Sequence, residues 1–105
     1  FTPFGRTADG FETQLGVNHV GHFLWTELVV DLVPAGGRVV VLSSAGHRLG
    51  DVDLTDPGWE RRDYDKFAAY GASKTANLLH VLALANSRDS ESSSAHNMHA
   101  DHEKE

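Results

Sequence analysis

The sequence predicts an α/β fold whose sheet is incomplete. Apolar residues recur at helical spacing over residues 8–32 and again over residues 66–85, and a β-branched run at residues 38–42 (Arg-Val-Val-Val-Leu) lies between them. The run does not alternate between apolar and polar residues, which is typical of a strand buried on both faces in a parallel sheet covered by helices. One strand cannot complete such a sheet, so we expect residues 1–85 to form part of a domain of this type.

The first helix is predicted over residues 8–32, with Thr7 as its N-terminal cap. Gly16 and Gly21 interrupt its pattern, and each costs about 1 kcal/mol relative to alanine. Two glycines so close together indicate a kink or a close approach by another part of the backbone. Asn18 lies between them, although a mid-helix asparagine is more often a tolerated polar residue than a functional one.

Two serines, Ser43 and Ser44, directly follow the predicted strand. In open α/β sheets, binding sites form beyond the carboxyl ends of the strands, so hydroxyl groups here are well placed for catalysis. A polar turn after a strand is the commoner explanation when the serines are considered alone.

The connection at residues 47–65 that follows is long and polar, and long connections inside compact domains are often functional. Its aspartates do not match a calcium-binding EF-hand loop, and we expect three aromatic residues to fold it down as a flap: Trp59, Tyr64 and Phe67.

The second helix, residues 66–85, carries Tyr70 and Lys74. Side chains four residues apart share one helix face, with Cβ atoms about 5–6 Å apart. An ammonium at that distance favours the phenolate form of a tyrosine, which makes the tyrosine a usable general acid or base. This spacing arises by chance in roughly one in five chains of this length. Whether the Tyr70–Lys74 spacing indicates catalysis therefore depends on the surrounding residues. The same helix also carries small residues that would let it pack closely against a neighbour: Gly71, Ala72, Ser73 and Ala76.

Composition excludes several classes of function. The chain has 105 residues, a net charge of -6 and a pI of about 5.5, which argues against nucleic acid or an anionic membrane as a partner. It has no cysteine, so neither disulfides nor thiolate-bound metals are possible. No apolar run reaches the about 20 residues of a membrane span, and no signal peptide is visible. We expect a cytoplasmic protein.

Residues 86–105 are polar and charged, and Met98 is their only large apolar residue. This composition predicts a disordered tail. His96, His99 and His102 recur every three residues, a spacing that can capture a divalent metal adventitiously. We predict no functional metal site.

Three motifs occur in order along the chain. Residues 17–23 (Val-Asn-His-Val-Gly-His-Phe) contain Asn18, and residues 37–44 (Gly-Arg-Val-Val-Val-Leu-Ser-Ser) end at Ser44. The third motif is Tyr70-x-x-x-Lys74, with an alanine and an asparagine behind it. Together they resemble the central segment of the short-chain dehydrogenase/reductase family, whose members are Rossmann-fold, nicotinamide-dependent oxidoreductases. Residues 7–12 (Thr-Ala-Asp-Gly-Phe-Glu) and 44–50 are similar to the retinol-dehydrogenase-like branch of that family.

The resemblance implies a partial Rossmann-like fold and a role for each of four residues. Tyr70 would exchange a proton with the substrate oxygen, and Ser44 would hydrogen-bond the same oxygen. Lys74 would assist the ionisation of Tyr70 and, with it, bind the nicotinamide ribose of NAD or NADP. Asn18 would hold a water behind Lys74. The substrate would be a small alcohol or carbonyl compound.

The sequence also departs from the family pattern. The glycine-rich turn that holds the cofactor pyrophosphate is not in this sequence, which argues against NAD or NADP binding by this chain alone. We therefore expect a fragment that is an enzyme by descent but inactive in isolation, with marginal stability or a molten state. The alternative function is a non-catalytic piece that associates through helices 8–32 and 66–85, with itself as a homodimer or with an intact relative. A hydrolase using Ser44 and His47 is less favoured because no Gly-x-Ser-x-Gly elbow is present.

Overall fold

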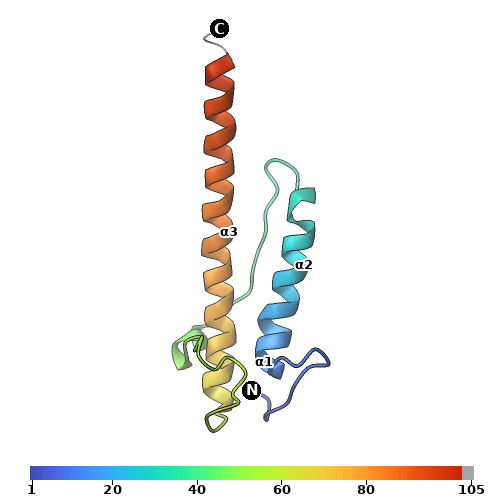
Figure 1. Ribbon diagram of the computed structural model, residues 1–105, viewed down its shortest axis with the longest axis vertical. Coiled ribbons are helices and arrows are strands. Elements are labelled where there is room, and N and C mark those ends of the chain that lie inside the picture. Colours follow the sequence, from blue (N-terminus) through green and yellow to red (C-terminus); the bar gives the residue numbers. More distant parts are fainter. Residues whose placement is uncertain (103–105) are drawn as a thin grey trace.

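The computed structural model describes the backbone of residues 1–102 and the side chains of residues 1–89. Four helical elements follow one another without a break: α1 (Thr13–Leu15), η1 (Gly16–Val20), α2 (Gly21–Val29) and η2 (Val30–Leu32). A short 3₁₀ turn, η3 (Ala45–Leu49), precedes the long helix α3 (Lys66–His102). Figure 1 shows the first helical segment beside the lower half of α3, with the connecting chain running between them.

The first helical segment ends near residue 32 as predicted, but it begins at Thr13 rather than at residue 8. Glu12 caps it, because its carboxylate accepts hydrogen bonds from the backbone N–H groups of Gln14 and Leu15, both at 2.8 Å. The prediction of Thr7 as the cap is wrong. The Thr7 N–H instead donates to the Phe11 carbonyl at 2.7 Å, which closes a turn and delays the helix.

The irregularity predicted at Gly16 and Gly21 is present as the π-helical element η1, in which Asn18 is the middle residue. A Cβ on Gly16 would lie 2.6 Å from Cγ2 of Thr7, so the first glycine permits a close approach by that side chain. Single π-helical turns inside α-helices occur frequently at functional sites. The distortion therefore marks the part of the first segment that carries Asn18.

Residues 38–42 are extended, but no strand is present in the part of the chain that the structure describes. The prediction of a buried strand is therefore not met. Val40 is 81% exposed and Leu42 is 78% exposed, so the run lies open on its outer side. A strand exists only when neighbouring strands supply hydrogen bonds to its backbone. The described residues offer no such neighbour, and the run passes between α2 and α3 on its own (Figure 1).

Helix α3 begins at Lys66 as predicted, and Asp65 caps it by accepting hydrogen bonds from the N–H groups of Phe67 at 2.9 Å and Ala68 at 3.2 Å. Its backbone continues beyond the predicted end near Ala85, as far as His102. The side chains from residue 90 onward lie outside the described residues. The predicted division into residues 1–85 and a disordered tail at 86–105 stays a prediction.

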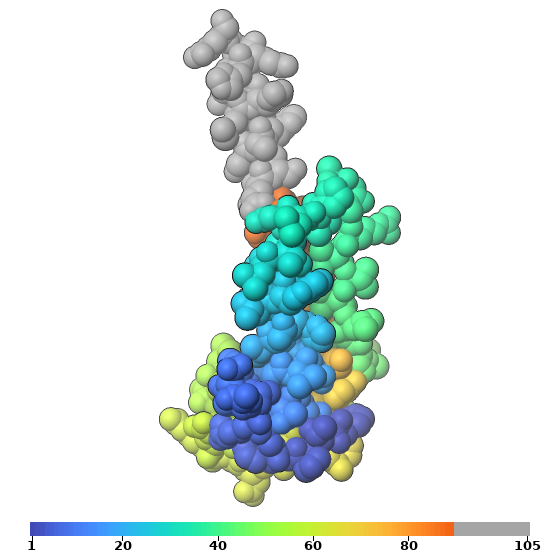
Figure 2. Space-filling model, turned by 90° about the vertical axis from the view of Figure 1, so that its right-hand side faces the viewer, coloured from blue at the N-terminus to red at the C-terminus, as the bar shows by residue number. Residues whose placement is uncertain are grey.

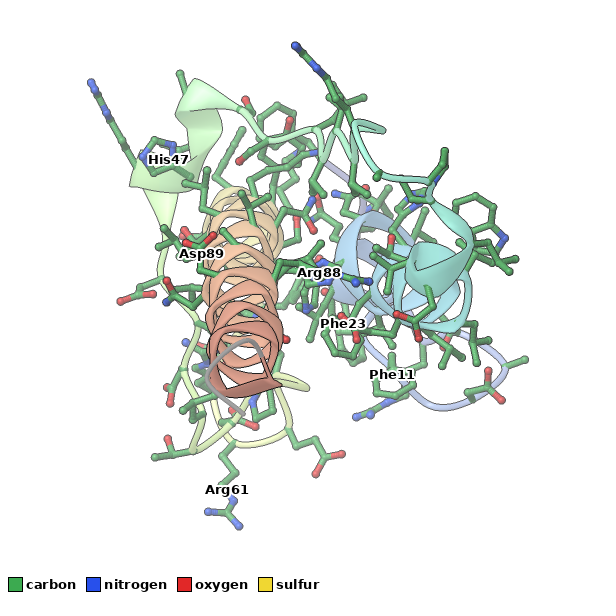
Figure 3. All side chains as sticks on the ribbon, turned by 90° about the horizontal axis from the view of Figure 1, so that it is seen from above. Phe11, Phe23, His47, Arg61, Arg88 and Asp89 are labelled. Atoms are coloured by element: carbon green, nitrogen blue, oxygen red, sulfur yellow. The ribbon has the colours of Figure 1, made fainter. Side chains whose placement is uncertain are left out.

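Small residues let α3 pack closely on two sides, as predicted. Against η3, a Cβ on Gly71 would lie 2.4 Å from the backbone N of Gly50, so only glycine fits. On the side that faces the first helical segment, Ala69, Ala72 and Ala76 are buried. Figure 3 shows η3 and α2 on different sides of α3, with Phe23 directed from α2 toward α3.

The connection at 47–65 folds down as a flap over the start of the helices. Trp59 is buried, its ring packs edge-on against Tyr64 with centroids 5.3 Å apart, and the Arg62 guanidinium lies 3.6 Å above the Trp59 ring. Asp56 accepts hydrogen bonds from the N–H groups of Glu60 at 2.8 Å and Arg61 at 3.1 Å, which lowers the pKa of its carboxyl group. Phe67 does not join this cluster. It is half exposed and contacts Phe1.

Candidate functional site

Tyr70 and Lys74 lie on one face of α3, as the spacing predicts. The Lys74 ammonium nitrogen is 5.5 Å from the centroid of the Tyr70 ring. The Phe1 ring also packs against the Tyr70 ring, with centroids 4.4 Å apart. The pair is therefore partly buried at the end of the molecule where the flap and the N-terminal residues meet.

Ser44 and Tyr70 both lie against Gly46, which belongs to η3. The Ser44 hydroxyl oxygen accepts a hydrogen bond from the Gly46 N–H at 3.0 Å. A Cβ placed on Gly46 would be 2.7 Å from Cε1 of Tyr70 and 3.3 Å from the Ser44 hydroxyl. Both groups thus converge on the space that the missing side chain of Gly46 leaves open.

Ser43 makes a different contact from Ser44. Its hydroxyl donates a hydrogen bond to the backbone carbonyl of Lys74 at 2.9 Å. This bond attaches the end of the extended run to the turn of α3 that carries the lysine. The sequence analysis assigned Ser44 rather than Ser43 to the site, and this contact gives Ser43 a structural partner.

Asn18 reaches α3 through Ser73, a residue that the sequence analysis did not select. The Asn18 side-chain amide donates to the Ser73 hydroxyl at 3.0 Å, and that hydroxyl donates to the backbone carbonyl of Tyr70 at 2.6 Å. Ser73 is 0% exposed. The predicted residue Asn18 is therefore connected to the turn of α3 that carries Tyr70 by two consecutive hydrogen bonds.

A groove of about 520 Å³ opens between α2 and the extended run, and Asn18 and Lys74 line one end of it. Figure 2 shows the face of the molecule on which the first helical segment and the chain that follows it lie side by side. A second groove, of about 390 Å³, lies between the extended run and α3 and is lined mainly by valines and small residues. The extended run thus has open space on both sides.

Asn77, also on α3, is a second buried polar residue that lies beside the proposed site residues. Its side-chain nitrogen donates to the backbone carbonyls of Asn18 at 2.9 Å and Leu42 at 3.0 Å. Its side-chain oxygen accepts from Nδ1 of His19 at 3.1 Å. The sequence carried two signals for it: Asn77 is the asparagine behind the Tyr70-x-x-x-Lys74 motif, and it follows Lys74 by three residues on the same helix face.

His47 does not activate Ser44. Its Nδ1 contacts the backbone carbonyl of Ser44 at 2.7 Å, whereas the Ser44 hydroxyl is engaged by Gly46. Figure 3 shows His47 on η3, on the side of α3 that does not face α2. The geometry therefore gives no support to the serine–histidine hydrolase alternative.

No group of three potential metal ligands occurs among the residues whose side chains are described, and the three tail histidines fall outside them. The same part of the chain contains no helix with the length and apolar character needed to cross a membrane.

Searches among known proteins find relatives that cover 79% of this chain. It is 45% identical over 85 residues to human retinol dehydrogenase 13, 48% identical to human retinol dehydrogenase 12 and 45% identical to human retinol dehydrogenase 14. The aligned part covers 26%, 27% and 25% of these relatives, so the chain spans about a quarter of their length. No family model matches the chain.

A solved structure agrees with these matches. The crystal structure of an uncharacterised protein from Mycobacterium paratuberculosis aligns with 74% of this chain at a TM-score of 0.64 and 43% identity, and the aligned part is 28% of that protein. The chain is therefore homologous over most of its length to retinol dehydrogenases of the short-chain dehydrogenase/reductase family. The resemblance inferred from its motifs is confirmed.

Proposed function

We propose that this chain carries the catalytic residues of an NAD(P)-dependent short-chain dehydrogenase/reductase, which transfers hydride between the nicotinamide and an alcohol or carbonyl substrate. The observation that supports it best is the convergence of Ser44 and Tyr70 on Gly46, with Lys74 one turn away. A hydroxyl that can hold a substrate oxygen thus lies near a phenol that can exchange a proton with it. The relatives, which are retinol dehydrogenases, support oxidoreductase descent.

Each proposed residue has a distinct task. The Tyr70 hydroxyl donates a proton to the carbonyl oxygen during reduction, or accepts the proton of the alcohol during oxidation. Ser44 donates a hydrogen bond to the same oxygen and keeps it within reach of Tyr70. Lys74 places its positive charge beside Tyr70, and Asn18 supports the turn behind the pair through Ser73.

The residues present fit one part of the nicotinamide cofactor. Tyr70 and Lys74 offer a hydroxyl and an ammonium that would hold the ribose next to the nicotinamide. The bound nicotinamide supplies the hydride chemistry, and the protein supplies position and charge. A glycine-rich turn leading into a helix, which holds the pyrophosphate in such proteins, does not occur in this sequence. Neither NAD nor NADP is favoured by the residues present.

A hydrophobic alcohol or aldehyde is the proposed substrate class. The names of the relatives state an action on retinol, which is a hydrophobic alcohol. The flap at residues 47–65 would form one side of the pocket, because it precedes α3 and packs over its start. A cytoplasmic location stays a prediction.

Turnover measured by nicotinamide absorbance, in a preparation in which this chain acts on a long-chain alcohol or aldehyde, tests this proposal. Tyr70→Phe removes the proton-exchanging hydroxyl, and we expect it to lower kcat by at least about 100-fold. Tyr64→Phe is the comparison because it removes the chain's other phenol, whose hydrogen bonds are to Glu12 and Gln14 and not to any of the proposed catalytic residues. Equal losses in the two variants, or turnover that survives in Tyr70→Phe, would contradict the proposal.

A second candidate is a non-catalytic chain that associates through its two helices, residues 8–32 and 66–85. The observation that favours it is the exposure of Leu24, Leu28 and Leu32, which form a row along the outer side of the first helical segment. A titration with NADH and NADPH separates the candidates, because no fluorescence change at millimolar cofactor would leave only the second. Concentration-dependent sedimentation that Leu28→Lys abolishes would then support association.

A further inference from the structure

We propose that Asn77 is a positioning residue that holds together the three segments carrying the proposed site. Its side chain is the point at which η1, the end of the extended run and α3 meet. These segments carry Asn18, Ser44 and the Tyr70–Lys74 pair, respectively. The inference depends on the proposed function for its catalytic meaning, but the junction itself can be tested without any activity.

The side-chain amide of Asn77 uses both of its N–H donors and its acceptor oxygen in hydrogen bonds. Both N–H groups are donated, to the backbone carbonyls of Asn18 at 2.9 Å and of Leu42 at 3.0 Å. The side-chain oxygen accepts from Nδ1 of His19 at 3.1 Å. Because two carbonyl oxygens face the nitrogen, the orientation of the amide is determined, and the proton of neutral His19 must lie on Nδ1. Asn77 is 4% exposed, so water does not replace these bonds.

Each partner of Asn77 lies in a segment of irregular backbone. Asn18 and His19 lie in the π-helical turn η1, whose geometry departs from that of the helices on either side. Leu42 lies in the extended run, which has no strand partner among the described residues. A buried side chain that donates to both backbone segments therefore fixes where each of them lies relative to α3.

The position of Asn77 on α3 connects these bonds to the reactive pair. It follows Lys74 by three residues and Tyr70 by seven, so all three share one helix face. Asn77 and Lys74 also line the same groove with Asn18. Ser43 adds a bond from the extended run to the Lys74 carbonyl. A shift at the Asn77 junction would therefore change the distance from Tyr70 and Lys74 to both Asn18 and Ser44.

Asn77→Asp tests the junction in the whole 105-residue chain by nuclear magnetic resonance. The carboxylate keeps the shape of the amide and the acceptor for His19, but it cannot donate to the two carbonyls. We expect the backbone amide resonances of residues 17–20 and 42–46 to move and their hydrogen exchange to accelerate at least about tenfold, whereas the ¹⁵N signature of an Nδ1-protonated His19 persists. Asn77→Ala removes the acceptor for His19 as well, so this variant should show the same backbone changes and should lose the His19 signature.

Thr75→Val is the matched control. Thr75 lies two residues before Asn77 on α3, and its hydroxyl contacts the backbone carbonyls of His47 at 3.1 Å and Gly50 at 2.9 Å. Loss of the Thr75 hydroxyl should shift the backbone amide resonances of residues 47–50 and leave those of residues 17–20 unchanged. If Thr75→Val and Asn77→Asp both shift backbone resonances throughout the chain to the same extent, Asn77 makes only a general structural contribution and the proposal is overturned. Unchanged resonances of residues 17–20 in Asn77→Asp would also overturn it. If Asn77→Asp does not fold, Asn77→Ser is used, and loss of helix in both variants also overturns it.

Kinetics then connect the junction to the proposed reaction. In a preparation that turns over substrate, we expect Asn77→Ser to lower kcat by about 100-fold with little change in KM, because displacements near 1 Å can cost that much. If Asn77→Asp shows the local resonance changes but the wild-type protein shows no turnover, the result would count against the proposed function alone. An active Asn77→Ser with unchanged kcat would overturn the positioning role.

Discussion

Gly46 shows how a single missing side chain shapes the proposed site. The Tyr70 ring and the Ser44 hydroxyl both lie where its side chain would be, and a Cβ there would approach Cε1 of Tyr70 to 2.7 Å. Real Cβ contacts are longer than this, so the ring would have to move. The glycine is needed for space and not for an unusual backbone angle, because its φ is not positive.

Gly46→Ala is therefore expected to displace the Tyr70 ring and to cost about 1–3 kcal/mol through overpacking. The measurement is the ring proton spectrum of Tyr70 together with urea unfolding. Gly58→Ala serves as the control because its added Cβ would meet no atom closer than 3.7 Å. Unchanged Tyr70 ring signals in Gly46→Ala would show that the close contact is absent in solution.

Tyr64 is the second residue with a clear physical signature. Burial raises the pKa of Tyr64 above 10.0. The carboxylate of Glu12, which accepts a hydrogen bond from the Tyr64 hydroxyl at 2.7 Å, acts in the same direction. The Gln14 amide donates to its oxygen at 2.9 Å and opposes this shift. The neutral form of Tyr64 is therefore favoured in the folded chain.

This shift predicts a loss of stability in alkali. A group whose pKa is raised by folding contributes stability that is complete below its unfolded pKa, near 10.0, and is lost as the pH rises through its folded pKa. The free energy of unfolding, measured with urea from pH 8 to pH 12, should therefore fall above pH 10. Tyr64→Phe should be less stable at neutral pH and should show a smaller decrease in alkali. The same slope in both proteins would contradict this assignment.

At the scale of elements, the start of the first helix is determined by a buried carboxylate. Glu12 is almost inaccessible, and its two oxygens accept from the N–H groups of Gln14 and Leu15 and from the Tyr64 hydroxyl. Gln14 in turn donates to the carbonyl of Lys66, at the start of α3. The same polar cluster thus joins the N-termini of both helical segments and the flap.

Glu12→Ala is expected to destabilise the chain by about 2–3 kcal/mol, because it removes a cap and leaves a buried hydroxyl without its acceptor. Thermal unfolding followed by circular dichroism at 222 nm measures this. Glu60→Ala is the comparison. Glu60 forms an exposed ion pair with Arg6 at 3.2 Å, and such pairs contribute about 0–1 kcal/mol. Equal effects would mean that the Glu12 cluster is not formed.

At the scale of the whole molecule, little apolar surface is buried. Trp59 and three alanines are the buried apolar residues among those described, whereas Leu28 is 72% exposed and Leu32 is 80% exposed. The buried set also includes polar residues that rely on hydrogen bonds, such as Ser73, Asn77 and His80. Alanine side chains contribute little hydrophobic free energy, so the packing between the segments is weakly stabilised.

We therefore expect the isolated chain to be helical but weakly cooperative. Far-ultraviolet circular dichroism should show helix, the dye ANS should bind the exposed leucines, and urea unfolding should have a low midpoint and a small m value. Leu28→Lys should reduce dye binding without a loss of helix. A sharp thermal transition without dye binding would contradict this prediction.

The features of the fold that the sequence predicted correctly depend on residues that are close together in the chain. The spacing of Tyr70 and Lys74, the start of α3, the disturbance around Gly16 and the flap with Trp59 and Tyr64 all follow from residues close together in the chain. The motifs that contain them also sufficed to recognise the family. The first helix was expected too early because the hydrogen bond from the Thr7 N–H to the Phe11 carbonyl closes a turn that the apolar pattern does not reveal.

The sequence by itself determined the presence of two helical segments, the start of the second at Lys66 and the order of the proposed site residues, but not the start of the first at Thr13. Only the tertiary structure decided that Ser44 and Tyr70 share the space beside Gly46, and that Asn77 joins Asn18 to the end of the extended run. It also decided that residues 38–42 remain unpaired in the described part. The physical reason is that helices satisfy their backbone hydrogen bonds locally, whereas strand pairing and buried polar junctions need partners from distant parts of the chain.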